Sequence, residues 1–319
     1  MSKDISVVVP IYFEEENIFP LYERIIGVVS EEMNLDYEII FVNDGSKDDS
    51  VQNIKQLIEQ DQNIRLLNFS RNFGHQVAVT AGLEHTEGEV VVIIDADLQD
   101  PPELIRDMYE KYKQGYDVVY AKRKSRAGES FFKKKTAKLF YRVLDFMSDV
   151  DIPLDTGDYR LMSRRVVEQL NNMPEKNRFI RGLVTWVGYQ QTYVEYNRDE
   201  RHAGETGYSL SKMIKFSLDG ITSFSTFPLK IATIFGVGIS GISFIYILRI
   251  IYLKLFTEKT IQGWSSIMVS NLFLGGIILL TLGILGEYIG RIYTELKSRP
   301  QYIIKDKYGF SEEQQDGQK

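Results

Sequence analysis

Short apolar runs alternate with amphipathic stretches over the first third of the chain. The runs are rich in Val and Ile, a composition typical of strands that are buried on both faces of a sheet. They lie at Ile5–Pro10, Tyr37–Asp44, Ile64–Ser70, Glu89–Asp97 and Asp117–Arg123. The stretches between them have helical length. This order predicts an α/β domain with a mostly parallel, Rossmann-like sheet and helices on both faces.

Two much longer apolar stretches follow near residue 229. Ile231–Leu248 and Thr260–Gly286 contain no charged residue. A helix rises 1.5 Å per residue, so about 20 residues cross the roughly 30 Å hydrocarbon core of a bilayer. Neither stretch has the amphipathic pattern of a surface helix. We therefore predict two transmembrane helices, with a hairpin buried in a soluble core as the alternative.

These patterns predict three parts of the chain. Residues 1–228 form a cytosolic domain, 229–296 a two-helix membrane anchor, and 297–319 a cytosolic C-terminal tail. The N-terminal residues lack the apolar core of a signal peptide. Lys and Arg residues flank the helix pair on its outer sides, in agreement with the positive-inside rule. We expect the protein in the cell (inner) membrane, with both termini in the cytoplasm.

A basic segment near the middle of the chain points to the membrane surface. Lys122–Arg142 holds nine basic residues and one acidic residue. Apolar side chains recur through its second half at helical spacing, which predicts an interfacial amphipathic helix at about 131–147. A second interfacial helix is expected at about 209–227. A solvated basic helix on a soluble domain is the alternative interpretation.

Composition excludes several kinds of chemistry. The 319 residues include no cysteine, so a thiol nucleophile, a disulfide framework and a zinc-thiolate site are all excluded. The net charge of −6 argues against a nucleic-acid partner. The three histidines are too scattered to form a metal site, although His75 and His202 lie in motif-like loops where each could contact a substrate.

Polar motifs follow three of the predicted strands. Pro10-Ile-Tyr-Phe-Glu14 ends the first, Asn43-Asp-Gly-Ser46 the second, and Asp95-Ala-Asp97-Leu-Gln99 the fourth. Ligands of parallel sheets bind at the carboxyl ends of the strands. Two carboxylates at i and i+2 suit a hard divalent cation such as Mg²⁺ or Mn²⁺. Taken singly, the acidic pair could be a solvated turn, and Asn43–Ser46 could be a tight turn with a helix cap.

In this order and spacing, the three motifs resemble glycosyltransferase family 2, whose members have the GT-A nucleotide-sugar-binding fold. The Asp-Leu-Gln-Asp-Pro-Pro sequence that starts at Asp97 and the two C-terminal spans look like the polyprenyl-phosphate glycosyltransferases. These include the dolichol-phosphate mannose synthases and, more similar still, the bactoprenol glucosyltransferases of O-antigen modification in the cell envelope. The resemblance covers essentially residues 4–305.

The resemblance implies roles on the donor side of a sugar transfer. The nucleotide sugar would lie among Pro10, Tyr12, Glu14, Asp44 and Asp95. Mg²⁺ or Mn²⁺ would be bound at Asp95, Asp97 and Gln99, and Arg123 would face the donor diphosphate as a catalytic residue. The sequence departs from the family pattern at Phe13, because asparagine often follows the tyrosine.

Further residues are implied on the acceptor side. Arg201 and Lys212 are suited to an anionic lipid phosphate, because a guanidinium offers a fork of donors and an ammonium a compact charge. Asp158 matches the residue usually proposed as the catalytic base. A phosphate monoester with a second pKa of about 6 is already mostly dianionic at pH 7, so removing its proton contributes little. We therefore expect Asp158 to orient the acceptor or the sugar.

The function implied is an inverting hexosyl transfer, with UDP-glucose as the preferred donor and a polyprenyl phosphate, undecaprenyl phosphate, as acceptor. Alternatives are GDP-mannose or another UDP-sugar as donor, or a non-catalytic nucleotide-sugar sensor in the membrane. A processive polysaccharide synthase would carry a Gln-x-x-Arg-Trp segment, which this sequence lacks. The small residues of Gly236-x-Gly238 and Gly275-Gly276 permit close helix contacts and favour a homo-oligomer.

Overall fold

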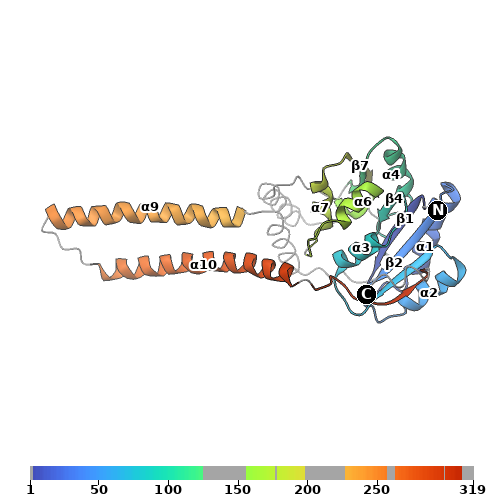
Figure 1. The fold of residues 1–319 in the computed structure, drawn as a ribbon. Helices are drawn as coiled ribbons and strands as arrows, with labels where there is room; N and C mark the ends of the chain where they lie inside the picture. The colour runs from blue at the N-terminus through green and yellow to red at the C-terminus, as the bar shows by residue number, and fades with distance from the viewer. Residues whose placement is uncertain are drawn as a thin grey trace. The chain divides into compact units, whose positions relative to one another are not determined.

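The computed structural model describes residues 3–124, 156–176, 178–197, 227–256, 263–297 and 299–310 (Figure 1). The chain divides into two compact units. The first, which we call the sheet unit, comprises residues 1–142, 150–210 and 299–319, and the second, the helical unit, comprises 143–149 and 211–298. The two units are described separately.

The strands described in the sheet unit form one eight-stranded sheet in the order β7-β5-β6-β4-β1-β2-β3-β8. Their bounds are β1 Ile5–Ile11, β2 Tyr37–Asn43, β3 Ile64–Phe69, β4 Val90–Ile93, β5 Val118–Arg123, β6 Thr156–Ser163, β7 Gln191–Tyr196 and β8 Ile304–Tyr308. β1 pairs in parallel with β2 and β4, β2 with β3, and β5 with β7. β6 runs antiparallel to β4 and β5, and β8 antiparallel to β3. The prediction of an α/β fold with a mostly parallel sheet is confirmed.

All five predicted strands are present, but the fourth is shorter than predicted. β4 ends at Ile93, so Asp95 and Asp97 lie in the loop that follows it. The apolar run continues to Ile94, which is buried without being part of the strand. The backbone of Asp95 and Asp97 is therefore not constrained by the strand pairing that ends at Ile93.

Helices cover both faces of the sheet (Figure 1). They are α1 Ile18–Ile26, continued by η1 Gly27–Glu32, α2 Ser50–Gln60, α3 His75–Glu84, α4 Leu104–Lys113, α6 Arg164–Asn171 and α7 Ile180–Val187. Ile39 and Phe41 of β2 belong to the apolar cluster that includes α1, α2 and α4, whereas Ile40 belongs to the cluster with α3. This alternation follows from the two-residue period of a strand.

The segment expected to be a C-terminal tail contributes to the sheet instead. Residues 299–310 belong to the sheet unit, and β8 forms its edge beside β3. Tyr302 stacks on Phe69 with ring centroids 5.1 Å apart, and Phe310 is buried. Gly309 has φ +78°, and a Cβ there would lie 2.2 Å from the carbonyl oxygen of Ile64. Glycine is thus required where the chain leaves the edge strand.

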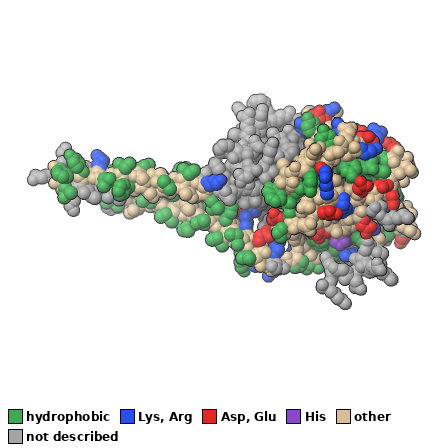
Figure 2. All heavy atoms as spheres, turned by 45° about the horizontal axis from the view of Figure 1, so that its top comes forward, with side chains coloured by type: hydrophobic (Ala, Val, Ile, Leu, Met, Phe, Trp, Pro, Cys, Tyr) green, Lys and Arg blue, Asp and Glu red, His purple; other side chains and the backbone are tan. Residues whose placement is uncertain are grey.

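The helical unit contains α9, Phe227–Phe256, and α10, Trp264–Leu296. Within the described part of this unit, Phe273–Leu296 is long and apolar enough to cross a membrane, and Ala232–Tyr246 of α9 is apolar but shorter. Large apolar side chains are exposed along both helices (Figure 2). One candidate span is thus supported by length and composition, and the second span stays a prediction. The predicted interfacial helices lie almost entirely outside the described residues.

Candidate functional site

Most of the described candidate residues gather at one edge of the sheet. Tyr12 and Asp44 follow the carboxyl ends of β1 and β2, and Asp95 lies just beyond β4. Arg123 is the last residue of β5. Asp158 lies near the start of β6, and because β6 runs antiparallel to β4 and β5, its first residues reach the same edge.

The turns after β1 and β2 are hydrogen bonded to each other. The Ser46 hydroxyl accepts a bond from the backbone N–H of Phe13 at 3.0 Å, and Asn43 Oδ1 accepts one from the N–H of Ser46 at 3.2 Å. Gly45 has φ +77°, and a Cβ there would lie 2.6 Å from the backbone of Arg71. Phe13 itself has φ +58°, which is unusual for a bulky residue. The first two motifs therefore form one structural element.

The residues predicted to bind the donor differ in their exposure and in their hydrogen bonds. Tyr12 and Phe13 are about half exposed, and their rings meet edge to face with centroids 4.6 Å apart. The Glu14 carboxylate accepts a hydrogen bond from Asn17 Nδ2 at 2.6 Å. Pro10 is a buried residue inside β1, opposite Val42, rather than a residue of the turn. Of the predicted donor residues, Tyr12 is thus the one that offers an exposed aromatic ring to a planar ligand.

Asp44 holds the loop that leads into α3. Its carboxylate accepts hydrogen bonds from the N–H of Phe73 at 2.6 Å, the N–H of Gly74 at 3.0 Å and Asn72 Nδ2 at 2.8 Å. The residue is almost wholly buried. Burial raises the pKa of Asp44 above its ordinary value, and the N–H donors oppose that shift. The carboxylate is therefore already surrounded by donors from its own chain.

The acidic pair after β4 has a different environment. Asp95 Oδ1 is buried and accepts no hydrogen bond from any described residue; His75 Nε2 lies 3.6 Å away. Burial raises the pKa of Asp95 to about 6, the nearby His75 lowers it, and Asp158 raises it further. Asp97 Oδ1 accepts a bond from the backbone N–H of Gln99 at 3.1 Å. An uncompensated buried oxygen is costly and commonly marks a functional site.

These two carboxylates fit a hard divalent cation. The bare oxygen of Asp95 is a ligand atom of the kind that Mg²⁺ and Mn²⁺ prefer. Across the described residues, no group of three or more His, Asp or Glu side chains has the arrangement of a metal site. Ions of this kind commonly complete their coordination with water and with substrate phosphates.

Asp158 lies at the centre of a network that the sequence analysis largely missed. Arg181 Nε donates to its Oδ1 at 2.8 Å, and Gln76 Nε2 and His75 Nε2 lie 3.2 and 3.1 Å from its Oδ2. Burial by itself raises the pKa of Asp158, but Arg181 and His75 together hold it well below its ordinary value. Asp158 is thus a carboxylate that remains ionised.

His75 links the two acidic regions. Its Nε2 lies 3.1 Å from Asp158 and 3.6 Å from Asp95. Burial lowers the pKa of His75, but the hydrogen bond to Asp158 and the charge of Asp95 outweigh it and raise the pKa to about 9. The protonated imidazole therefore separates two carboxylates and reduces the negative charge of the site.

The signals for Arg181 and Gln76 were weak. Arg181 is the single charged residue in the run Phe179–Val187, which forms the apolar helix α7. Gln76 directly follows His75 at the start of α3, and its Oε1 accepts a bond from the N–H of Ile180 at 3.0 Å. The one sequence signal that could have identified Arg181 is its position as a lone charge in an apolar run, because such a charge needs a buried partner when the run is packed.

Arg123 is held at the same edge by aromatic and acidic partners. Its Nε donates to the Tyr196 hydroxyl at 3.2 Å, and its Nη2 lies 3.9 Å from Asp100. The Tyr196 hydroxyl in turn donates to Asp100. The side chain stays about one quarter exposed. Arg201 and Lys212, the predicted acceptor residues, lie outside the described residues.

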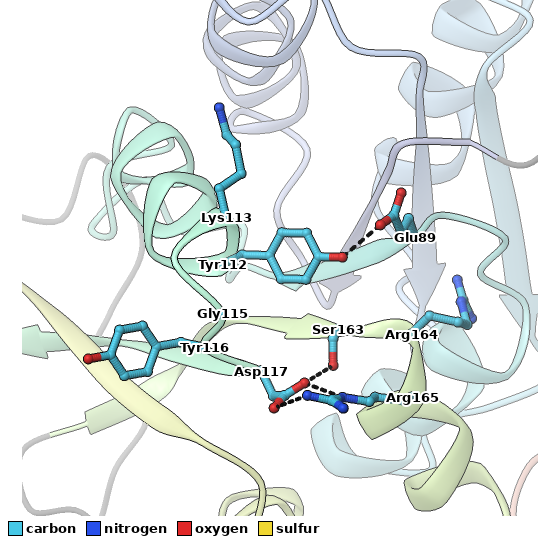
Figure 3. A pocket seen from close by; sticks show the side chains of 9 residues that line it. All are labelled: Glu89, Tyr112, Lys113, Gly115, Tyr116, Asp117, Ser163, Arg164 and Arg165. Carbon is cyan, nitrogen blue, oxygen red and sulfur yellow. Dashed lines mark hydrogen bonds and ion pairs between the residues drawn. The ribbon is translucent and has the colours of Figure 1, made fainter.

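A pocket of about 410 Å³ lies at the opposite end of the strands (Figure 3). Its lining includes Glu89 and Asp117, which precede β4 and β5. Tyr112 donates to Glu89, and Arg165 pairs with Asp117 (Figure 3). Several of its charged groups are thus paired with one another, and it is remote from the carboxyl edge where sheets of this kind bind ligands. We do not assign the reaction to it.

Known proteins are similar to this sequence along most of its length. The family described as Glycosyl transferase family 2 matches residues 6–170. The "Uncharacterized glycosyltransferase YkcC" of Bacillus subtilis is 55% identical over 97% of this chain and 96% of its own length. The "Bactoprenol glucosyl transferase" of Shigella phage SfX is 45% identical over 95% of this chain and 99% of its own length.

Among solved structures, glucosyl-3-phosphoglycerate synthase from Mycobacterium tuberculosis aligns with a TM-score of 0.45 and 20% identity, over 69% of this chain and 78% of that chain. The match to the family spans half of the chain, and the sequence relatives extend it to nearly the whole length. The chain therefore belongs to glycosyl transferase family 2 and is a glycosyltransferase.

Proposed function

We propose that this enzyme transfers glucose from UDP-glucose to a polyprenyl phosphate, undecaprenyl phosphate, at the cytosolic face of the membrane. The observation that carries the proposal is the 45% identity to a phage bactoprenol glucosyl transferase over 95% of this chain and 99% of that protein. Similarity over nearly both full lengths includes the helical unit as well as the sheet unit. A shared acceptor lipid would account for that extent.

On the donor side, the nucleoside binds at the joined turns after β1 and β2. The exposed ring of Tyr12 offers a stacking surface. Glu14 lies two residues further along the chain, and the backbone N–H of Asp44 donates to the carbonyl of Ile11, next to Tyr12. Because the Asp44 carboxylate already holds residues 72–74, its contribution to the donor is to fix the loop beside it. Pro10 acts through the end of β1 rather than through its side chain.

The diphosphate lies beyond β4 and β5. Mg²⁺ or Mn²⁺, held by Asp95 and Asp97 near Gln99, would supply positive charge to the departing nucleoside diphosphate. Arg123, fixed by Tyr196 and Asp100, adds a guanidinium to the same leaving group. Charge stabilisation and positioning then account for most of the catalysis.

On the acceptor side, Asp158 orients a substrate group and does not act as a base. Its pKa is held well below the ordinary value by Arg181 and His75 against the effect of burial, so it is a poor proton acceptor. The acceptor phosphate is already mostly dianionic at pH 7. Its oxygen attacks the anomeric carbon opposite the leaving diphosphate, which inverts that centre. Arg201 and Lys212 bind the lipid phosphate.

The membrane arrangement belongs to the same proposal. Both α9 and α10 span the inner membrane, so the sheet unit and both termini are cytosolic. The basic segment Lys122–Arg142 and a helix at about 209–227 lie on the anionic membrane surface. At Gly236, Gly238, Gly275 and Gly276 an added Cβ would meet no atom within 4 Å, which leaves room for a second copy of the chain to pack closely.

The test is a transfer assay with the full-length protein in detergent. Polyprenyl phosphate is incubated with a panel of radiolabelled UDP- and GDP-sugars in the presence of Mg²⁺ or Mn²⁺, and label is counted in the organic phase. We expect label from UDP-glucose, and a rate of labelling about 10² to 10³ times lower with Asp97→Ala. Label from GDP-mannose or another UDP-sugar alone would correct the donor, and no transfer from any donor would leave a nucleotide-sugar sensor.

A further inference from the structure

A row of polar side chains crosses the sheet beneath the donor turns. Asn43 of β2 is in register with Asn68 of β3, and Asn68 is in register with Asp306 of β8. Asn43 is wholly buried, Asn68 nearly so, and Asp306 partly exposed at the edge of the sheet. Asp306 comes from the segment that follows α10, far from the donor motifs in the sequence.

These side chains form a continuous hydrogen-bonded chain. Asn68 Nδ2 donates to Asp306 Oδ2 at 3.1 Å, and Asn43 Nδ2 donates to Asn68 Oδ1 at 2.8 Å. Asn43 Oδ1 then accepts the backbone N–H of Ser46 at 3.2 Å. The Ser46 hydroxyl accepts the N–H of Phe13 at 3.0 Å. This series of hydrogen bonds therefore connects β8 to the turns after β1 and β2.

The direction of every bond is set by the two ends. A carboxylate such as that of Asp306 only accepts, so the amide nitrogen of Asn68 must face it. The amide oxygen of Asn68 is then left for Asn43, which must offer its own nitrogen. This leaves Asn43 Oδ1 for the backbone N–H of Ser46, which only donates. Reversing either amide would place two donors or two acceptors together in the buried part of the chain.

We propose that Asp306 is a positioning residue for the donor nucleotide. It fixes the amide orientations of Asn68 and Asn43, and so the position of Ser46 relative to Phe13. The inference rests on the proposed function, in which the nucleoside binds at these turns. If Asp306 no longer accepts a hydrogen bond, the side-chain amide of Asn68 can rotate, and the position of Ser46 relative to Phe13 is less firmly fixed. No group that touches the donor is lost.

The attachment of β8 can be separated from this role. Tyr302 stacks on Phe69 and its hydroxyl donates to Glu84, and Phe310 packs edge to face on His85. None of these contacts involves Asn68 or Asp306. Tyr302→Phe therefore loosens the C-terminal segment without changing the hydrogen-bonded chain, and it is the matched control for a purely structural effect.

The test compares five full-length proteins in detergent: wild type, Asp306→Ala, Asn68→Asp, Asn68→Asp with Asp306→Asn, and Tyr302→Phe. Asn68→Asp sets two carboxylates against each other. Adding Asp306→Asn restores the bond with its donor and acceptor exchanged, while the second oxygen of the carboxylate introduced on β3 still accepts from Asn43. The readouts are KM for UDP-glucose, KM for polyprenyl phosphate, kcat and thermal unfolding.

Loss of one hydrogen bond predicts a rise of about fivefold in donor KM for Asp306→Ala and Asn68→Asp, with kcat and acceptor KM within about twofold. Donor KM of the double variant should return to within about twofold of the wild-type value, and donor KM of Tyr302→Phe should stay within that range. Unchanged donor KM in Asp306→Ala, or no rescue in the double variant, would overturn the positioning role alone. If the wild type transfers no glucose from UDP-glucose, the proposed function fails first and this role with it.

Discussion

Asp44 and Asp95 hold comparable places in the sheet unit but have opposite surroundings. Each lies just after a strand that pairs in parallel with β1, Asp44 after β2 and Asp95 after β4. Asp44 accepts hydrogen bonds from two backbone N–H groups and one amide. Asp95 keeps a buried oxygen that accepts no hydrogen bond from the described residues.

The difference separates a carboxylate that builds the site from one that is available to a ligand. The donors around Asp44 come from residues 72–74, so its charge is used to fix that loop. Burial raises the pKa of Asp95 to about 6, because the nearby His75 offsets only part of that effect and neighbouring carboxylates add to it. A group left in such a state is stabilised when a cation binds. The same substitution, Asp to Asn, should therefore act differently at the two positions.

The largest expected effect is on activity at Asp95. Asp95→Asn removes the carboxylate that we propose as a metal ligand and should lower kcat by a factor of about 10² to 10³, the range seen when a charge-stabilising group is lost. Asp97→Ala should behave alike, and an excess of EDTA should reproduce the loss in the wild type. Initial rates of sugar transfer measure all three. Activity within tenfold of the wild type in both variants would contradict the metal assignment.

Asp95→Asn should also leave the protein at least as stable as the wild type. The pKa of Asp95 is raised from 3.8 in the unfolded chain to about 6 in the folded protein, so ionisation destabilises the metal-free fold increasingly between these two pH values and fully above about pH 6. Removing the charge should raise Tm in EDTA at pH 8, and the gain should shrink as the pH falls below about 6. A clear drop in Tm at pH 8 would show that Asp95 has a structural role.

At Asp44 the same substitution should act mainly on stability. Asp44→Asn places an amide N–H₂ among donors, so at least one of Phe73 N–H, Gly74 N–H and Asn72 Nδ2 loses its acceptor. An unsatisfied buried donor costs about 1–3 kcal/mol. For a unit of this size that corresponds to a fall of about 5 °C in Tm. Thermal unfolding of the two Asp→Asn variants side by side tests the contrast, and equal Tm changes would remove it.

Much of this edge could be predicted from the sequence, because local signals specified it. The buried parallel strands are continuous Val- and Ile-rich runs, and the motifs directly follow them. Pairing of distant segments could not be predicted in the same way. β8 has the sequence Ile-Lys-Asp-Lys-Tyr, whose charges suit an exposed edge and resemble a polar tail. Arg181 reaches Asp158 because tertiary packing, including that of α7 on α6, brings α7 close to the start of β6, and no local sequence pattern encodes that contact.

A third carboxylate, Asp158, extends the comparison with a smaller expected effect. It resembles Asp44 in being surrounded by donors, but two of those donors, Arg181 and His75, are charged side chains. Arg181→Lys keeps the charge and loses the two-point contact made by Nε and Nη2. We expect kcat to fall about threefold to tenfold, as for the loss of one charge-assisted hydrogen bond.

Steady-state kinetics against both substrates measure this effect. Arg181→Gln is the companion variant, because it removes the charge and should lower kcat further and reduce Tm. If Arg181→Lys and Arg181→Gln both had the kcat of the wild type, the contact geometry and the charge at Asp158 would both be unimportant for turnover.

The smallest expected effect concerns backbone strain, which occurs both in the turn after β1 and in the loop after β4. Phe13 after β1 has φ +58° and Leu98 after β4 has φ +57°. Asparagine adopts this left-handed region more readily than bulky apolar residues do. Phe13 is half exposed, so Phe13→Asn should lose little packing and raise Tm by about 1–3 °C. Leu98 is buried in the main apolar cluster.

Leu98→Asn is therefore the matched control, with the same relief of strain and a large loss of apolar burial, and it should lower Tm. If Phe13→Asn instead lowered Tm by as much as Leu98→Asn, the Phe13 ring would be packed against the protein rather than exposed. Should Phe13→Asn raise Tm while also raising KM for UDP-glucose, the aromatic side chain would be retained for the donor at the expense of the backbone. That outcome would place backbone strain and contact with the donor in the same turn.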